Sequence, residues 1–533
     1  MVKIPKKTLE DLEYFEVLRQ CSSFAITPLG KEACLSILPL TEEEQLLKDL
    51  QAVSEFRSSF ENENRIPNHG FDPITSIFSL LSIENSVLDI SVFRVIAANT
   101  ETTNTLLLFL DKFKAYYPTL QRHTEDLYVD KEIKKTIDGV IDRFGEVRDN
   151  ASESLYLIRK QIQQLRSKIS SSFNKALSQY QAADYLDDIR ESVLDNRRVL
   201  AVKAMHRRKV KGAIMGSSKT GSIVFMEPEV TNAQNRELQN LLFEEGEEIK
   251  KILSQLTDYF RPHLPYLKQQ HAFLLGMDVL YAKARYAQEI EAIFPSIDRK
   301  HRRIEYKAAY HPLLLQSHRL ENKVTYPQDV LLHPEKRIVV ISGPNAGGKS
   351  ITLKTVGLLQ LMLQSGMLIP VHESSKACLF TQILTDIGDN QSIENELSTY
   401  SYRLTRMKKF LALSNPETLL LLDEFGTGSD PDLGGALAEA FFESLYRKKI
   451  FAILTTHYSN IKSRAVQLPQ AVNGCMLFNP INLQPLFRFE MGSPGSSFTF
   501  EVAKINGVSE SLIEKAKKKL NKEKLRFSEL LSD

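Results

Sequence analysis

The sequence contains few cysteines, and these few are scattered. The four cysteines lie far apart among 533 residues and form no CxxC pair; they are Cys21, Cys34, Cys378 and Cys475. This pattern argues against both a zinc site and a disulfide framework, so we expect four ordinary thiols.

Long apolar runs are also absent. No stretch of eighteen or more apolar residues occurs, which argues against a membrane span. The N-terminus, MVKIPKKTLEDLEYFEVL, becomes acidic where a signal peptide would become apolar. We therefore expect a cytoplasmic protein with no membrane partner.

A strong charge of one sign is the third absence. The chain has 68 Lys and Arg residues against 66 Asp and Glu residues, a formal net charge of +2. Any surface that binds nucleic acid must therefore be a local patch. The chain is too long for one hydrophobic core, so two or more domains are expected.

The pattern of apolar residues predicts three regions that differ in their secondary structure. Residues 1–150 read as a helical core, in which turn signals such as ITPLG interrupt the helices. Residues 151–300 read as long lever helices, at about 151–187 and 231–290, each with a narrow apolar seam typical of coiled-coil arms. Glu245 is a gap in the second seam, and RPHLP at 261–265 interrupts the helix.

The segment between the two predicted arms, about residues 190–230, is rich in strand-forming residues and has a GSSKTG turn. No Asp or Glu occurs from Arg197 to Met226. We interpret it as a small β-rich clamp at the tip of two antiparallel helices. Its basic residues are candidates for binding a nucleic-acid backbone, although a charge run can also be only a solvated face; they are Arg197, Arg198, Lys203, Arg207, Arg208, Lys209, Lys211 and Lys219.

From about residue 301 to 520, short apolar runs alternate with helical stretches. RIVVISG, TLLLLDEFG and FAILTTH could each be a buried strand. This alternation is typical of a parallel sheet covered by helices. The predicted fold is therefore mixed: an all-α helical core with long coiled-coil arms and a small β-rich clamp, then an α/β P-loop domain. Residues 521–533 would start a further helix.

The stretch GPNAGGKS at 343–350 matches the phosphate loop G-x-x-x-x-G-K-[ST], and it lies between an apolar strand and a helix. Lys349 could contact the β- and γ-phosphates of ATP, and Ser350 could bind Mg²⁺. The predicted ATP-binding residues run through the loop into the helix: Gly343, Pro344, Asn345, Ala346, Gly347, Gly348, Lys349, Ser350 and Ile351.

Two later strand ends carry further candidates. Asp423 could hold the Mg²⁺ through water, and the adjacent Glu424 could polarise the attacking water as a general base. His457 ends the third strand, where it could contact the γ-phosphate. A base and a sensor together predict ATP hydrolysis rather than ATP binding alone.

This order of strand ends resembles the ABC class of ATPases. In that class a serine-bearing helix start from the opposite subunit closes each nucleotide. NQSIENELSTYSYRL (390–404) lies where that element belongs, so the resemblance implies that Ser398 and Thr399 act in trans in a homodimer. A plain helix cap is the alternative.

Longer stretches resemble the MutS family. GPNAGGKSITLKTVGLLQLMLQSGMLIP is similar to its phosphate loop, and GSPGSSFTFEVAKINGVSESLIEKAKKKL to its closing segment. YHPLL (310–314) is similar to its base-supporting motif, which implies a role for His311. Chromosome-structure ATPases differ, because their coiled coil interrupts the head between the two Walker motifs.

Three further stretches resemble the second bacterial MutS paralogue, which lacks mismatch-reading domains: TPLGKEACLSILPLT, DIGDNQSIENELSTYS and RRVLAVKAMHRRKVKGAI. Members of that paralogue continue into a C-terminal Smr domain, whereas this sequence stops at KEKLRFSELLSD. No nuclease activity is therefore expected from these residues.

The resemblance implies an ATP-gated clamp but leaves its target open. One hypothesis is binding of branched DNA, in repair and suppression of recombination. A second is recognition of collided ribosomes through ribosomal RNA, followed by splitting of the subunits. A third is a scaffold that ATP locks without turnover. Phosphate contacts carry no base sequence, so the basic clamp does not separate the first two.

Overall fold

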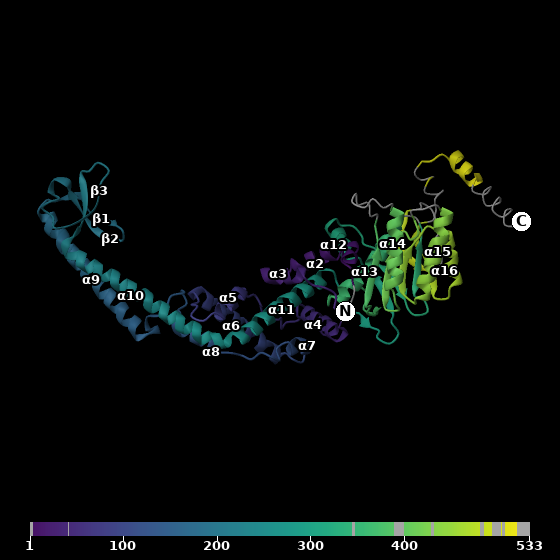
Figure 1. Cartoon of the computed structure of the whole chain (residues 1–533), viewed down its shortest axis with the longest axis horizontal. Coiled ribbons are helices and arrows are strands. Elements are labelled where there is room, and N and C mark those ends of the chain that lie inside the picture. Colours follow the sequence, from purple (N-terminus) through teal and green to yellow (C-terminus); the bar gives the residue numbers. More distant parts are fainter. Residues whose placement is uncertain are drawn as a thin grey trace. The chain divides into compact units, whose positions relative to one another are not determined.

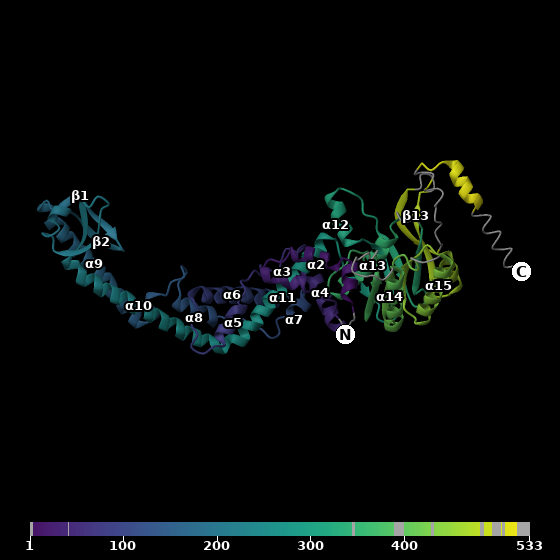
Figure 2. The same ribbon diagram turned by 45° about the horizontal axis from the view of Figure 1, so that its top comes forward.

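The computed structural model describes residues 4–40, 42–343, 347–388, 399–427, 431–479, 484–492, 503 and 507–519. These residues form two compact units. The first unit comprises residues 1–70, 109–124 and 275–533, and the second comprises 71–108 and 125–274. Figures 1 and 2 show both units from two directions. No helix of the described part combines the length and the apolar character that crossing a membrane requires.

The first unit contains a parallel sheet flanked by helices. Its strand order is β10-β11-β12-β8-β13-β14, and all pairs are parallel except β13 with β14. The strands are β8 (Ile338–Ser342), β10 (Gln382–Asp386), β11 (Thr418–Leu422), β12 (Phe451–Thr455), β13 (Ala471–Phe478) and β14 (Pro485–Met491). Every residue of β8, β11 and β12 is buried, as expected where helices cover both faces.

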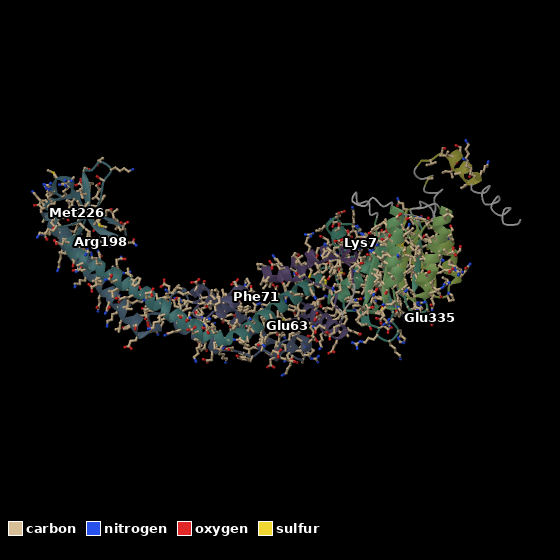
Figure 3. All side chains as sticks on the ribbon, viewed as in Figure 1. Lys7, Glu63, Phe71, Arg198, Met226 and Glu335 are labelled. Carbon is tan, nitrogen blue, oxygen red and sulfur yellow. The ribbon has the colours of Figure 1, made fainter. Side chains whose placement is uncertain are left out.

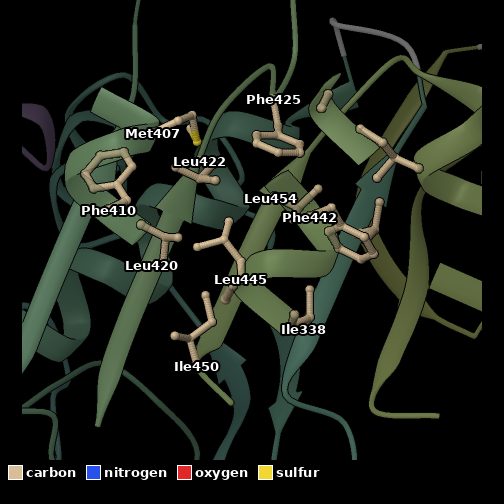
Figure 4. Packing of buried hydrophobic residues seen from close by; sticks show 14 of the residues in the cluster. Ile338, Met407, Phe410, Leu420, Leu422, Phe425, Phe442, Leu445, Ile450 and Leu454 are labelled. Carbon is tan, nitrogen blue, oxygen red and sulfur yellow. The ribbon is translucent and has the colours of Figure 1, made fainter. Parts of the chain in front are cut away.

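Alternate residues of these strands face opposite layers of helices. One face packs against α14 (Thr399–Leu413), α15 (Pro431–Arg447) and α16 (Ser459–Gln467). Figure 4 shows Leu420, Leu422 and Leu454 of the sheet beside Met407, Phe410 and Phe442 of these helices. The other face packs against α13 (Lys349–Gln364), which is buried along most of its length.

A second, smaller sheet and several helices complete the first unit. The small sheet has the order β5-β9-β6-β7. Its strands are β5 (Ser296–Ile297), β6 (Ile304–Ala309), β7 (Gln328–Leu332) and β9 (Lys376–Ala377). The helices are α1 (Lys6–Asp11), α2 (Tyr14–Ser22), α3 (Pro28–Leu35), α4 (Glu43–Ser59), α7 (Pro118–Arg122) and α12 (Pro312–Leu320).

The second unit is mainly helical. Two helices extend from one unit into the other: α6 (Ile90–Lys112) and α11 (Leu264–Glu289). The remaining helices are α5 (Thr75–Leu81), α8 (Glu132–Val140), α9 (Glu153–Ala182) and α10 (Glu229–Phe260), with short 3-10 turns η1 (Asp149–Ala151), η2 (Ala204–His206) and η3 (Arg261–His263). The RPHLP stretch thus interrupts the helix as a turn between α10 and α11.

The long helices α9 and α10 run side by side in both views (Figures 1 and 2). Leu155, Ile162 and Leu165 of α9 are buried, and Leu155 packs with Ile252 of α10. Leu256 of α10 is buried in the cluster that includes residues of α6 and α8. Tyr259, near the end of α10, is exposed.

Glu245, the gap in the apolar pattern, accepts a hydrogen bond from Arg159 Nε at 2.7 Å, which joins α10 to α9. Ser152, the N-cap of α9, donates to Glu248 Oε1 at 2.8 Å near the same level. Polar pairs at a helix contact fix the register of the two helices. The break in hydrophobicity at Glu245 is therefore a cross-link between the helices.

A small four-stranded sheet lies between α9 and α10 in sequence and at one end of the pair in space (Figure 1). It is antiparallel with the order β1-β2-β4-β3. Its strands are β1 (Leu186–Leu194), β2 (Arg197–Lys203), β3 (Gly212–Ser217) and β4 (Ile223–Pro228). Leu200, Val202, Val224 and Met226 pack on Phe173 of α9 and anchor the sheet to the helix. We call this sheet with its loops, residues 186–228, the basic module.

Candidate nucleotide site and basic module

The candidate nucleotide site lies at the carboxyl ends of β8, β11 and β12, which are neighbours in the parallel sheet. Gly343 follows β8, Asp423 and Glu424 follow β11, and His457 lies two residues beyond β12. Polar groups that follow adjacent parallel strands meet at one edge of the sheet, which is where α/β proteins bind ligands. The sheet order therefore brings together residues as far apart in the sequence as Gly343 and His457.

The loop after β8 turns sharply into helix α13. Gly343 and Gly348 have φ values of +126° and +94°, a left-handed region in which side chains are strained. Gly348 is the N-cap of α13, so the free N–H groups of the first helical turn point out of the helix toward the loop. Ser350 lies in this first turn. Pro344, Asn345 and Ala346 lie outside the described residues.

Lys349 is buried and donates a hydrogen bond from Nζ to the carbonyl of Gly343 at 2.6 Å. Burial lowers the pKa of its ammonium group, and the charges of Asp423 and Glu424 oppose this effect. The two carboxylates therefore act on Lys349 from nearby. A buried cation between a helix N-terminus and two acids is suited to binding a polyphosphate with its metal ion.

The acidic pair is held by a residue that the sequence analysis did not select. Thr455 at the end of β12 donates from Oγ1 to Asp423 Oδ1 at 2.6 Å. The same oxygen accepts the backbone N–H of Glu424 at 2.7 Å. Thr455 thereby orients both acidic residues with one hydroxyl. The TTH stretch contained the signal, since a threonine at a strand end lies beside the adjacent strand's end.

His457 lies near the same charges. Desolvation lowers its pKa, Lys349 lowers it further, and Glu424 and Asp423 raise it less. The imidazole is therefore neutral at pH 7, so it can donate or accept a hydrogen bond there. The structure thus brings together Lys349, Asp423, Glu424 and His457.

A cavity of about 300 Å³ borders the loop glycine Gly348 and holds aromatic and apolar groups suited to a nucleotide base. Tyr326 and Phe487 stack there with their ring centroids 5.8 Å apart. The other lining residues come from α12 and its N-cap, the following loop, β7, α13 and β13: His311, Leu314, His318, Val324, Thr325, Gln328, Ile351, Thr355 and Met476. Tyr326 and Phe487 carry no motif, so the sequence analysis did not single them out.

His311 is the N-cap residue of α12 and is almost fully buried. Neither of its ring nitrogens has a hydrogen-bond partner among the residues that the structure describes. Burial, assisted by Lys354, lowers its pKa to about 4. A buried polar group without a partner is costly, and a base with hydrogen-bonding edges in the cavity would supply one.

The predicted trans element is only partly described. Ser398 lies outside the described residues, and Thr399 is the first residue of α14. Most of the predicted closing segment (492–520) also lies outside them, although residues 510–519 are helical.

The eight basic residues that were predicted to contact nucleic acid fall into two groups in the structure. Arg197 pairs with the buried Glu227 at 3.1 Å, and Lys203 pairs with Asp184 at 2.9 Å. Arg198 pairs with Glu191 and lies over the Phe173 ring, 4.2 Å from its centroid. Figure 3 labels Arg198 and Met226 in this module. These three cations serve the module's own packing.

The other five cations are exposed on the loops of the module: Arg207, Arg208, Lys209, Lys211 and Lys219. Three of them are consecutive and follow η2 directly. Lys209 Nζ lies 5.3 Å from the centroid of the Tyr185 ring. A short exposed loop with three adjacent cations is suited to contacts with a phosphate backbone.

Known proteins resemble this chain over most of its length. Residues 339–524 match the family described as MutS domain V. A protein named Endonuclease MutS2 from Carboxydothermus hydrogenoformans is 34% identical over 99% of this chain and 66% of its own length. Its namesake from Halothermothrix orenii is 32% identical over 99% of this chain and 67% of its own length. The Bacillus velezensis namesake is 32% identical over 97% of this chain and 65% of its own length.

The chain belongs to the MutS family. Its similarity to proteins named MutS2 extends over nearly all of its residues, which confirms the resemblance predicted from the sequence. The chain spans about two thirds of the length of the curated relatives that it matches.

The depressed pKa of His311 predicts a pH-dependent stability. Between the ordinary pKa of 6.5 and the folded value of about 4, the unfolded chain binds a proton that the folded chain does not. Stability from this group is thus complete above pH 6.5 and is lost as the pH falls toward 4. On lowering the pH from 7 to 5, His311 alone should cost about 2 kcal/mol.

Urea unfolding of the nucleotide-free protein at pH 7 and pH 5 measures this cost. His311→Phe should lose about 2 kcal/mol less than the wild type between the two pH values. The exposed His123 provides the control, because its side chain lies on the surface and His123→Phe should preserve the wild-type pH dependence. An equal loss in wild type and His311→Phe would contradict the assigned pKa.

Proposed function

We propose that this protein is an ATP-hydrolysing, homodimeric clamp on branched DNA that acts in repair and in suppression of recombination. The observation that carries the proposal is the acidic pair held by Thr455 beside the buried Lys349. ATP binding alone would need the phosphate loop but not an oriented carboxylate. The names of the relatives, Endonuclease MutS2, support an action on nucleic acid.

In the proposed site, Lys349 and the N-terminus of α13 bind the phosphates, and the base enters the cavity beside His311 and Ile351. Ser350 and Asp423 would hold Mg²⁺, which neutralises phosphate charge. Glu424 takes a proton from the attacking water, and His457 contacts the terminal phosphate. Ser398 and Thr399 of a second copy close the site. ATP and Mg²⁺ are thus the proposed ligands of the first unit.

The proposed clamp consists of the coiled-coil pair α9–α10 with the basic module at its end. The polar cross-link between Arg159 and Glu245 keeps the two helices in register, so the pair can transmit movement as one body. The five exposed cations would contact the phosphate backbone and release counterions. Arg197, Arg198 and Lys203 would contribute mainly by holding the module's shape.

Replacing Glu424 by Gln tests the proposed hydrolysis. The amide cannot accept the proton from water, so kcat should fall by a factor of about 10² to 10⁴. The affinity for ATP should stay within about twofold, because Gln preserves the shape and the Thr455 contact is made by the backbone. Phosphate release and equilibrium binding of a fluorescent ATP analogue measure the two quantities.

Glu335→Gln is a matched control. Glu335 is exposed, and it lies just after β7, far from Asp423 and Glu424 in the sequence. It should hydrolyse ATP at the wild-type rate. Wild-type turnover in Glu424→Gln would refute the assignment of the general base. A wild-type protein that binds ATP without turnover would instead support the locked scaffold.

Reversing three adjacent charges, Arg207→Glu, Arg208→Glu and Lys209→Glu together, tests the proposed nucleic-acid surface. Binding to a four-way DNA junction should weaken, and the slope of log K against log salt should decrease by about 2 to 3. The measurement is a salt titration by fluorescence anisotropy, with ribosome co-sedimentation in parallel.

The double variant Lys250→Glu and Lys251→Glu on α10 provides the control, because these lysines are also exposed cations of the second unit. It should keep the wild-type salt slope. An unchanged slope in the triple variant would refute the role of the module. Loss of ribosome binding with unchanged junction binding would favour the ribosomal function over the DNA function.

A further inference from the structure

Arginine 403 of α14 contacts the loop that carries the proposed general base. Its Nη1 donates to the carbonyl oxygens of Glu424 and Thr427, both at 3.2 Å, and also to Thr427 Oγ1. Thr427 in turn donates from Oγ1 to the Glu424 carbonyl at 2.9 Å. One guanidinium nitrogen therefore closes the turn between Glu424 and Thr427.

The backbone at Glu424 needs such support. Its φ is +49°, in the left-handed region that is unfavourable for residues other than glycine. Such a conformation persists only where neighbouring groups hold it. Thr455 holds the backbone N–H of Glu424 on one side, and Arg403 holds its carbonyl on the other. The direction of the Glu424 carboxylate depends on this backbone, because the side chain extends from it.

Apolar side chains of α14 and of this loop share one buried cluster, which includes Met407 and Phe425. A small cavity of about 30 Å³ remains between them, lined by Arg403, Leu404, Glu424 and Phe441 among others. A void removes contact partners from the atoms around it, so packing there is weaker. The hydrogen bonds of Arg403 supplement this packing between α14 and the loop.

The same helix is anchored at the end of β10 by a second arginine. Arg406 Nε lies 3.0 Å from Asp386 Oδ1, and Arg406 also donates to the Thr385 carbonyl. Thr385 donates from its own hydroxyl to Asp11 of α1 at 2.8 Å. Arg406 thus fixes the position of α14 on the sheet. Arg403 lies one turn earlier on the same helix and holds the loop that carries Glu424.

We propose that Arg403 is a positioning residue for ATP hydrolysis, which acts by holding the backbone of Glu424 in its left-handed conformation. Its described hydrogen bonds go to the loop that carries Glu424, so it should affect the chemical step and leave ATP binding unchanged. This inference rests on the proposed function, because it assumes that Glu424 is the general base. Arg403 belongs to neither the phosphate loop nor the acidic pair, so no sequence motif indicated its role.

Steady-state kinetics of Arg403→Gln and Arg403→Lys test the proposal. Arg403→Gln should lower kcat by between about tenfold and a hundredfold, because small displacements of a catalytic group have effects of this size. The KM and the dissociation constant of the fluorescent ATP analogue should change by less than about twofold. Arg403→Lys should recover part of the lost kcat, since an ammonium group can still donate to the loop.

A double-mutant cycle with Thr427→Ala keeps the proposal falsifiable if Arg403→Gln also lowers stability. Thr427→Ala removes one acceptor of the Arg403 hydrogen bonds and should lower kcat less than Arg403→Gln does. The double variant should be no slower than Arg403→Gln alone, because both changes break one network. Lys408→Gln, a loss of charge at an exposed position on the same helix, should keep the wild-type kcat.

The outcomes separate this inference from the proposed function. A wild-type kcat in Arg403→Gln, with Glu424→Gln inactive, would overturn the role of Arg403 and leave the function standing. Equal losses in kcat and in ATP affinity would also overturn it, since they indicate general damage to the site. An unchanged rate in Glu424→Gln would instead refute the proposed function itself.

Discussion

Parallel pairing of β11 with β12, and of β12 with β8, is the constraint on which the candidate site depends. Buried parallel strands carry mostly apolar side chains, so polar side chains appear where the strands end. Because the three strands are neighbours, the three ends coincide. Thr455 can then form hydrogen bonds with both Asp423 and Glu424, and the charges of both carboxylates act on Lys349. A different strand order would leave the same residues apart.

Much of the candidate site was predictable from the sequence, because its residues carry strong local patterns. The loop at 343–350 is specific in its glycine and lysine spacing, and Asp423, Glu424 and His457 each follow an apolar run. Thr455, Arg403 and Tyr326 were not predictable in their roles. Their contacts depend on which strands and helices become neighbours, and single-residue patterns contain little information about that.

The basic module and the helix pair illustrate the same limit. Eight cations looked equivalent within a window that has no acidic residues. Three of these cations form ion pairs with Glu191, Glu227 and Asp184. These acids lie outside the window, and only strand pairing and chain reversal bring them close to the cations. Glu245 looked like a defect in an apolar seam, and the structure makes it an ion pair with Arg159.

The proposed function requires that each ATP is hydrolysed between two copies of the chain. Mixing two inactive variants tests it most directly: Lys349→Ala, which lacks the phosphate-loop cation, and Ser398→Glu, which places a negative charge in the proposed trans element. Half of randomly formed dimers would be mixed, and each would hold one intact site, so an equimolar mixture should recover about a quarter of the wild-type rate. A mixture as inactive as its components, or full activity of Ser398→Glu alone, would contradict the composite site.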